Sequence, residues 1–227
     1  MDGPTGEILC NLWPRSEFSL RIGVDSKRGS EIFSTFGEGA GGILKRTESG
    51  SDNSLMLQVR AGRIDTLGLL FERHKNALFG YFYRITGSAE ISEDLVQNVF
   101  LRILKYRAQF AGEGKFTTWM YHIAHNVSAD HFQKCGVRPD AVDPPGAAME
   151  DCQTPEERML ERERLRLIED ALFQLSADQR EILVLSRFQG LKYREIGAIL
   201  GCSVGAVKVR VFRAIMSLKQ VYAELEG

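Results

Sequence analysis

The residues of this chain best suited to chemistry are cations that bind rather than groups that react. Between residues 201 and 220 the sequence holds four of them and no carboxylate: Lys208, Arg210, Arg213 and Lys219. Such a run suits a phosphate surface, because each cation that reaches a phosphate releases condensed counterions. The sequence contains no P-loop, clustered carboxylates or paired nucleophile and base, so we expect no catalytic residue and regard a nucleic-acid enzyme as a remote alternative.

These cations lie on a segment with the pattern of a helix-turn-helix. Residues 193–200 carry a helical apolar stripe, Gly201 stands where a left-handed residue ends a helix, and Ser203 can cap the next one. The predicted buried face of the second helix is Val204, Val207, Val211, Ile215 and Leu218. Its opposite face, which would enter a DNA groove, is Gly205, Ala206, Val209, Phe212 and Arg213, with Lys208 and Arg210 on the flanks.

Two other interpretations of this segment stay open. A generic helical hairpin with solvated charges would carry the same turn glycine and cap. Arg210 could also pair with Glu195 of the preceding helix and brace the hairpin instead of touching DNA. The glycine, the cap, the cations and the stripe agree with one another, and this agreement favours DNA binding.

Composition and charge indicate a binder with two contact regions. The chain has 227 residues, 44 % of them hydrophobic, and a net charge of −1, which allows one or two domains. Residues 56–134 hold ten cations and seven anions (+3), residues 135–157 hold one and six (−5), and residues 176–220 hold eight and three (+5). We expect neither membrane insertion nor export, and a cytoplasmic location, since no run approaches ~18 apolar residues and the N-terminus lacks a signal-peptide pattern.

A metal site is not expected, although the sequence has potential ligands in one stretch. His122, His125, His131 and Cys135 are all of types that bind zinc. His122 and His125 share a helix face, but His131 follows His125 by six residues and lies about 240° further round the helix. The histidines therefore point to different sides.

The N-terminal half begins with a low-order segment and continues with helices. Residues 1–55 are rich in Gly and Ser without a sustained period, so we expect them to be disordered. Helical periodicity starts directly behind Met56, so either translation can begin there or the segment is an ordinary flexible tail. Helices are predicted at residues 64–86, 91–106 and 116–134, with a glycine-containing loop at 107–115.

The last of these helices combines aromatic and titratable side chains. Trp119, Ile123, Val127 and Asp130 share one side, with Tyr121, His122 and His125 beside them. Aromatic residues next to a cationic loop suit a single-stranded nucleic acid, because bases stack on rings while the backbone follows the cations. The alternative is an ordinary helix core, which is favoured for Trp119 taken alone.

The C-terminal half follows a linker composition. Residues 135–155 contain four prolines, two glycines and a run of acids, which is typical of a linker. Thr154 and Pro155 then predict a helix start, and helices to about residue 175 and over 177–188 precede the helix-turn-helix. The predicted fold class is all-α: two small helical domains joined by a flexible linker, with a disordered N-terminal extension.

Four stretches, in order, resemble the extracytoplasmic-function (ECF, group IV) sigma factors of bacterial RNA polymerase, in the sigma-70 superfamily. They are FERHKNALFGYFYRITG, SEDLVQNVFLRILKY, FTTWMYHIAHNVSADHF and LSADQREILVLSRFQGLKYREIGAILGCSVGAVKVRVFRAIMSLK. The resemblance covers about residues 57–220, with Gly197 and Ala206 where alanine and threonine are more usual. It divides the chain into an extension at 1–55, region 2 at 56–134, an acidic linker at 135–155 and region 4 at 156–222.

The resemblance implies a non-enzymatic transcription initiation factor, with no cofactor or metal, that gives RNA polymerase its promoter specificity. The implied partners are core polymerase, through its β′ clamp and β flap, promoter DNA, and an anti-sigma factor. The implied polymerase-binding residues are Asp94, Leu95, Gln97, Asn98, Phe100 and Leu101. The alternative from another class is a two-domain regulator that binds duplex DNA and senses a ligand or partner through residues 57–134.

The same resemblance implies two DNA-binding surfaces. The melted minus-ten element would contact Ala111, Gly112, Glu113, Gly114, Lys115, Thr117, Thr118, Trp119 and His122. The duplex minus-thirty-five element would contact Ser203, Gly205, Ala206, Lys208, Val209, Arg210, Phe212 and Arg213.

Overall fold

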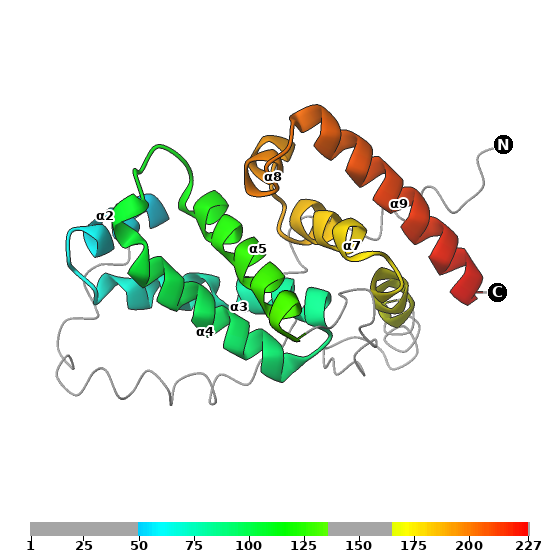
Figure 1. Ribbon diagram of the computed structural model, residues 1–227, viewed down its shortest axis with the longest axis horizontal. Helices are drawn as coiled ribbons and strands as arrows, with labels where there is room; N and C mark the ends of the chain where they lie inside the picture. The colour runs from blue at the N-terminus through cyan, green and yellow to red at the C-terminus, as the bar shows by residue number, and fades with distance from the viewer. Residues whose placement is uncertain (1–49, 136–164, 227) are drawn as a thin grey trace, which may run out of the picture.

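The computed structural model describes residues 50–135 and 165–226 (Figure 1). The first stretch contains α2 (Asp52–Arg60), α3 (Thr66–Thr86), α4 (Ala89–Lys105), the short 3-10 helix η3 (Arg107–Gln109) and α5 (Phe116–Cys135). The second contains a helix at 165–173, α7 (Ala177–Leu183), the π-helical turn η5 (Val184–Phe188), α8 (Tyr193–Ile199) and α9 (Val204–Glu226). These stretches hold helices and no strand, which confirms the all-α prediction. The predicted disorder of 1–49, most of the linker and the Thr154 cap lie outside the described residues.

Local sequence signals set the helix ends in the first lobe. Gly87 takes φ +70° and its N–H donates to Tyr83 O at 2.8 Å, which ends α3. Ser88 is extended, and its Oγ accepts from Ile91 N at 3.3 Å as the N-cap of α4. The predicted end of this helix at residue 86 is therefore confirmed.

The predicted boundary of the extension, between residues 55 and 56, is wrong, because it falls inside α2. Ser51 caps this helix by accepting from Ser54 N at 3.2 Å. Leu55 and Met56 are 1 % and 0 % exposed in the core. Asp52 pairs with Arg73 and His74 of α3, at 2.8 Å each. The polar Ser-Asp-Asn-Ser start of α2 hides its buried stripe from a periodicity reading.

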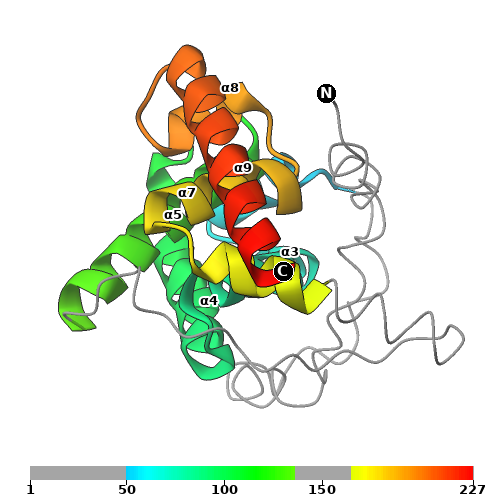
Figure 2. The same cartoon turned by 90° about the vertical axis from the view of Figure 1, so that its right-hand side faces the viewer.

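Two lobes pack through one continuous core. In the first lobe α3 packs on α2 and α4, and α4 on α5; in the second, α9 packs on α7 and α8. Figure 2 shows α9 lying across α7. The lobes meet where α5 packs on α8 and α3 packs on α7 and η5. Buried apolar residues of both lobes form one cluster.

A buried arginine of α7 lies at the junction of the lobes. Arg180 is 1 % exposed, so its guanidinium needs hydrogen-bond partners in place of water. It donates to three carbonyls of its own lobe, Leu172 O, Phe173 O and Leu175 O, at 2.6 to 3.1 Å. It also donates to Ile85 O of α3 at 3.1 Å.

We expect a chain that begins at Met56 to be less stable than one that begins at Gly50. The shorter chain loses the buried Leu55 side chain, worth about 1.5–3 kcal/mol of hydrophobic burial, together with the Asp52 contacts to Arg73 and His74. Urea unfolding of the two purified chains measures the difference in unfolding free energy. Equal unfolding free energies would show that α2 contributes nothing before Met56.

Candidate nucleic-acid interface

The turn of the helix-turn-helix has the predicted geometry. Gly201 takes φ +63°, and the Ser203 Oγ accepts from Ala206 N at 3.2 Å. The turn also approaches α8 closely, since a Cβ built on Gly197 would lie 2.7 Å from Cys202 O. Glycine at residue 197, where the resemblance leads one to expect alanine, therefore matches the close approach of the turn.

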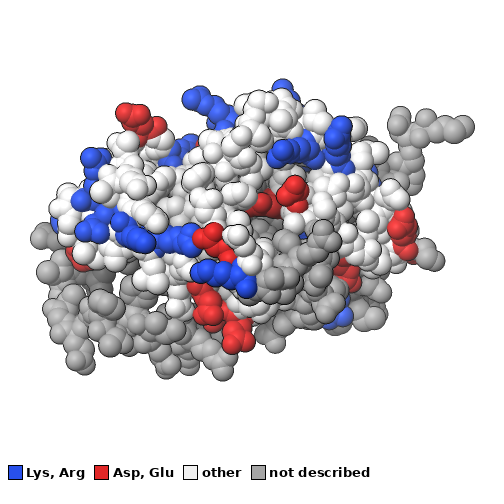
Figure 3. Space-filling model, viewed as in Figure 1, with Lys and Arg blue, Asp and Glu red and all other residues white. Residues whose placement is uncertain are grey.

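The outward face of α9 is apolar and cationic. Val209 and Phe212 are 49 % and 65 % exposed, Gly205, Lys208, Arg210 and Arg213 are exposed, and Ala206 is half-buried. Val207, Val211 and Ala214 are buried beneath them. The predicted buried stripe is wrong at Val204, the first residue of α9, which is 41 % exposed; Ile215 and Leu218 are half-buried. Within the face shown in Figure 3, Lys and Arg gather over α9 and, separately, in a band over the first lobe.

The proposed brace between Arg210 and Glu195 is absent from the described residues. Glu195 Oε1 instead pairs with Lys115 Nζ at 2.8 Å, and its Oε2 accepts from Lys192 N at 2.8 Å at the start of α8. Partial burial raises the pKa of Glu195, but these hydrogen bonds outweigh it, so the pKa lies below its ordinary value. Arg210 is thus left to the outward face, and a residue of the glycine loop is tied to the second lobe.

The glycine loop and the start of α5 form a partly covered surface. Ala111, Glu113, Gly114, Lys115 and His122 are exposed. Gly112, Thr117, Thr118 and Trp119 are half-buried. The Trp119 ring lies 5.3 Å from that of Phe110 and 6.3 Å from that of Phe116, so it belongs in part to an aromatic cluster. One side of Trp119 therefore packs in the core, and the rest reaches the surface, where base stacking stays a prediction.

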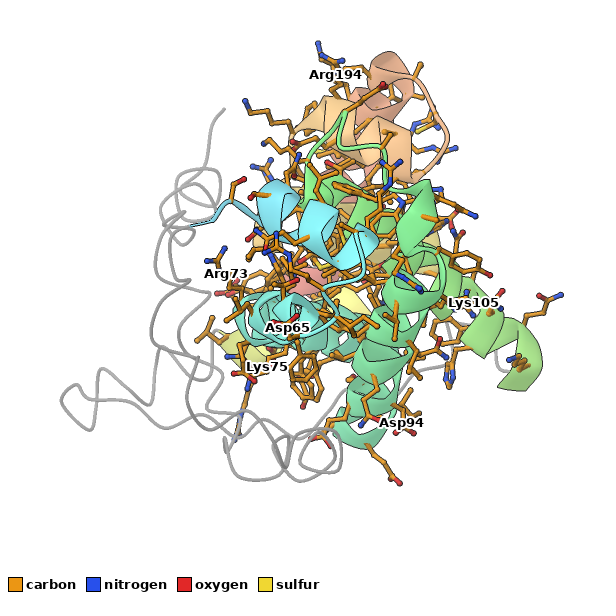
Figure 4. The ribbon with its side chains drawn as sticks, turned by 90° about the vertical axis from the view of Figure 1, so that its left-hand side faces the viewer. Asp65, Arg73, Lys75, Asp94, Lys105 and Arg194 are labelled. Atoms are coloured by element: carbon orange, nitrogen blue, oxygen red, sulfur yellow. The ribbon has the colours of Figure 1, made fainter. Side chains whose placement is uncertain are left out.

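The predicted polymerase face of α4 is divided between surface and core. Asp94 and Leu101 are exposed, Leu101 by 67 %, and Asp94 points away from the lobe in Figure 4. Gln97 and Asn98 are half-buried. The expectation that Leu95 and Phe100 lie on this surface is wrong. They are 5 % and 2 % exposed and lie on the buried stripe of the helix. In this arrangement they support the face from within.

A polar cluster between the lobes was missed by sequence reasoning. Glu181 of α7 accepts from the Tyr81 hydroxyl of α3 and lies 2.8 Å from His125 Nδ1 of α5. The Tyr121 hydroxyl donates to Gln189, whose amide donates to Ala77 O at 3.3 Å. The partners are too far apart in sequence for any local pattern to join them.

Burial and hydrogen bonding within this cluster shift the pKa values of Tyr81, Tyr121 and His125. The pKa of Tyr81 is raised well above its ordinary value, mainly by burial and next by the nearby Glu181 carboxylate. Burial also raises the pKa of Tyr121. The hydrogen bond to Glu181 raises the pKa of His125, against an opposing effect of burial, and Asp178 adds to the rise. A protonated His125 therefore stabilises the contact between the lobes.

The described residues hold no group of three His, Cys, Asp or Glu side chains placed to bind a metal. None of the described helices is both long enough and apolar enough to cross a membrane.

Comparison with known proteins gives two family matches and close relatives. The family model of sigma-70 region 2 matches residues 70–136, and that of sigma-70 region 4 matches residues 165–218. The RNA polymerase sigma-H factor of Pseudomonas aeruginosa is 30 % identical over 172 residues, 72 % of this chain and 89 % of that protein. The ECF RNA polymerase sigma-E factor of Haemophilus influenzae is 32 % identical over 173 residues, 72 % of this chain and 91 % of that protein.

Two solved structures share the fold. The sigma factor RpoE of Bartonella quintana, in complex with the anti-sigma factor NepR, matches with a TM-score of 0.55 and 26 % identity, over 68 % of this chain and 94 % of that one. CnrH in complex with the cytosolic domain of CnrY has a TM-score of 0.59 at 23 % identity, over 77 % of this chain and 99 % of that one, which supports the fold alone.

The two helical lobes, in this order and with this helix-turn-helix, define a sigma-70-type transcription initiation factor. The chain belongs to the ECF sigma factors, which direct RNA polymerase to promoters. This assignment does not favour the alternative of a ligand-sensing regulator.

We expect the stability that His125 gives to the lobe contact to depend on pH. Its pKa in the folded chain is raised, so its contribution is fully present below the unfolded value of about 6.5 and is lost as pH rises through the folded value. Urea unfolding of the wild type and of His125→Gln should therefore show a stability difference that is larger at pH 6 than at pH 8. A difference that grows with pH would contradict the protonated contact.

Proposed function

We propose that this sigma factor uses α4 to bind core polymerase, the glycine loop with the start of α5 to capture the melted minus-ten strand, and α9 to read the duplex minus-thirty-five element. The observation that carries the proposal is the outward face of α9, which combines exposed Arg213, Lys208 and Arg210 with no carboxylate from residue 201 to 220. The chain would act by binding alone, in the cytoplasm, and not as an enzyme.

On α9, side chains at the centre and at the flanks of the outward face would have different tasks. Arg213 and Phe212 lie opposite the buried Val207 and Val211, so they would point into the major groove, where an arginine can bind guanine with two hydrogen bonds. Lys208 and Arg210 would lie closer to the phosphates, which they would contact without reading sequence.

In the first lobe, the exposed Lys115 and the half-buried Trp119 would divide the work of strand capture. The cation would follow the phosphate backbone, and the free edge of the indole would stack on a base. In its pair with Glu195, which is 14 % exposed, Lys115 is itself 63 % exposed, so its ammonium stays within reach of DNA phosphates that would compete for it.

The closed contact between the lobes would have to open on the promoter. Elements named for positions about 25 base pairs apart would be separated by roughly 85 Å at 3.4 Å per pair, whereas α5 and α8 pack directly on each other. A proposed strand-capture residue, Lys115, is tied to Glu195 of the other lobe in the closed contact. The free chain would therefore be in a resting state.

An anti-sigma factor is a further proposed partner. The sigma factor RpoE of Bartonella quintana was solved in complex with one, and its fold is that of this chain. A partner of this kind would stabilise the closed contact or cover α4 and α9, the surfaces proposed for polymerase and duplex DNA.

We expect Arg213→Ala and Lys208→Ala to weaken promoter binding in different ways. Loss of Arg213 should cost about 1–3 kcal/mol on the preferred minus-thirty-five sequence and flatten discrimination among variants of it. Loss of Lys208 should weaken all duplexes alike and lower the salt slope by about one unit. Holoenzyme binding to a library of minus-thirty-five variants at several salt concentrations separates the two effects. Full discrimination by Arg213→Ala would show that the helix is rotated from the proposed orientation.

The double variant Asp94→Ala, Gln97→Ala should keep its helical content but fail to co-purify with core polymerase, because both side chains lie on the proposed docking face of α4. Glu224→Ala, which removes an exposed carboxylate of α9, is the matched control and should co-purify normally. Polymerase binding at the wild-type level by the double variant would rule out this face.

A further inference from the structure

Helix α2 runs along the loop that joins α4 to α5. Its residues Asn53, Leu57 and Arg60 are spaced by four and three positions, so they share one face of the helix. Arg60 Nη1 donates to Phe110 O at 2.9 Å, where the loop begins. Leu57 packs against Gly112, which takes φ +81°. A Cβ added at Gly112 would lie 3.3 Å from Leu57 Cδ2.

Asn53 contacts the end of this loop with both atoms of its side-chain amide. Its Nδ2 donates to Gly114 O, and its Oδ1 accepts from Phe116 N at 2.7 Å. The two contacts flank Lys115 on either side. One side chain thus fixes the backbone immediately before and after the cation proposed to follow the DNA strand.

The contact with Phe116 also completes the start of α5. Lys115 O accepts from Thr118 N at 3.1 Å and from Trp119 N at 3.3 Å, so Lys115 stands at the N-cap position. A lysine side chain has no acceptor with which to satisfy the free N–H groups of a first turn. Asn53 supplies that acceptor from another helix.

We propose that Asn53 is a positioning residue for minus-ten strand capture, which holds Lys115 and the first turn of α5, with Trp119, in the orientation that receives the strand. This role rests on the proposed function of the loop. Asn53 lies outside the match to sigma-70 region 2, which begins at residue 70. The two hydrogen bonds of Asn53 therefore add a specificity element to the surface that region 2 provides.

The amide is specifically suited to this task. It offers a donor and an acceptor on one short side chain, whereas aspartate can only accept and alanine can do neither. Asn53→Asp should therefore keep the bond from Phe116 N and lose the bond to Gly114 O. Ser54→Ala is the matched control, because Ser54 is the next residue of α2 and its side chain makes no hydrogen bond to the loop in the described part of the chain.

Hydrogen exchange of the full-length chain tests the hydrogen bonds of Asn53 to the loop. In Asn53→Ala the Phe116 amide should exchange about tenfold faster than in the wild type, as expected for loss of a hydrogen bond. Asn53→Asp should keep this protection, and Ser54→Ala should match the wild type. Unchanged exchange at Phe116 in Asn53→Ala would overturn the inference.

Promoter selection tests the consequence. Holoenzymes formed with core polymerase and each full-length variant select templates from a library randomised in both promoter elements. Asn53→Ala should lose about fivefold or more of its minus-ten preference, as the loss of one to two hydrogen bonds allows, with minus-thirty-five preference and polymerase affinity unchanged. Equal loss at both elements, or none at the minus-ten element, would overturn the inference.

Two further variants separate this inference from the function on which it rests. Lys115→Ala and Trp119→Ala remove the proposed strand contacts directly. If both keep the minus-ten preference, the proposed function of the loop fails and the role of Asn53 with it. If both lose it while Asn53→Ala keeps it, only the inference fails.

Discussion

The arrangement of the two lobes depends on two adjacent residues of α7. Arg180 donates to Ile85 O and Glu181 accepts from Tyr81, so both side chains reach into the first lobe. Arg180 also holds three carbonyls of its own lobe, and would keep them if the lobes separated. The tyrosine and carboxylate could then be solvated by water. Opening would also expose apolar residues of the core that the two lobes share, so new contacts with polymerase and promoter would have to offset that cost.

This constraint connects the two surfaces that are proposed to bind DNA. In the closed contact, Glu195 holds Lys115, so the start of the helix-turn-helix is tied to the loop proposed to capture the melted strand. The same loop is held from the other side by Asn53 of α2. Opening would release only the first of these contacts. The loop would then reach the promoter already shaped by its own lobe, with less conformational entropy to lose on binding.

The sequence predicts those features that depend on neighbouring residues. The end of α3 at residue 86, the Gly201 turn, the Ser203 cap and the outward face of α9 all follow from local signals, and the structure confirms their geometry. The contacts that the sequence does not predict are those whose partners are distant in sequence. Asn53 contacts a loop about sixty residues away, and Glu181 pairs with Tyr81, which lies 100 residues away. No helical periodicity in the sequence could predict either contact.

A distance measured between the lobes tests the account most directly. Spin labels at residues 105 of α4 and 216 of α9, both exposed, would be introduced as cysteines after the four native cysteines are replaced. Double electron–electron resonance on the full-length chain should give a single distance for the free protein. The distance should be clearly longer in the promoter-bound holoenzyme, because under the proposed function the lobes would have to part to reach both elements. An unchanged distance in that complex would contradict the account.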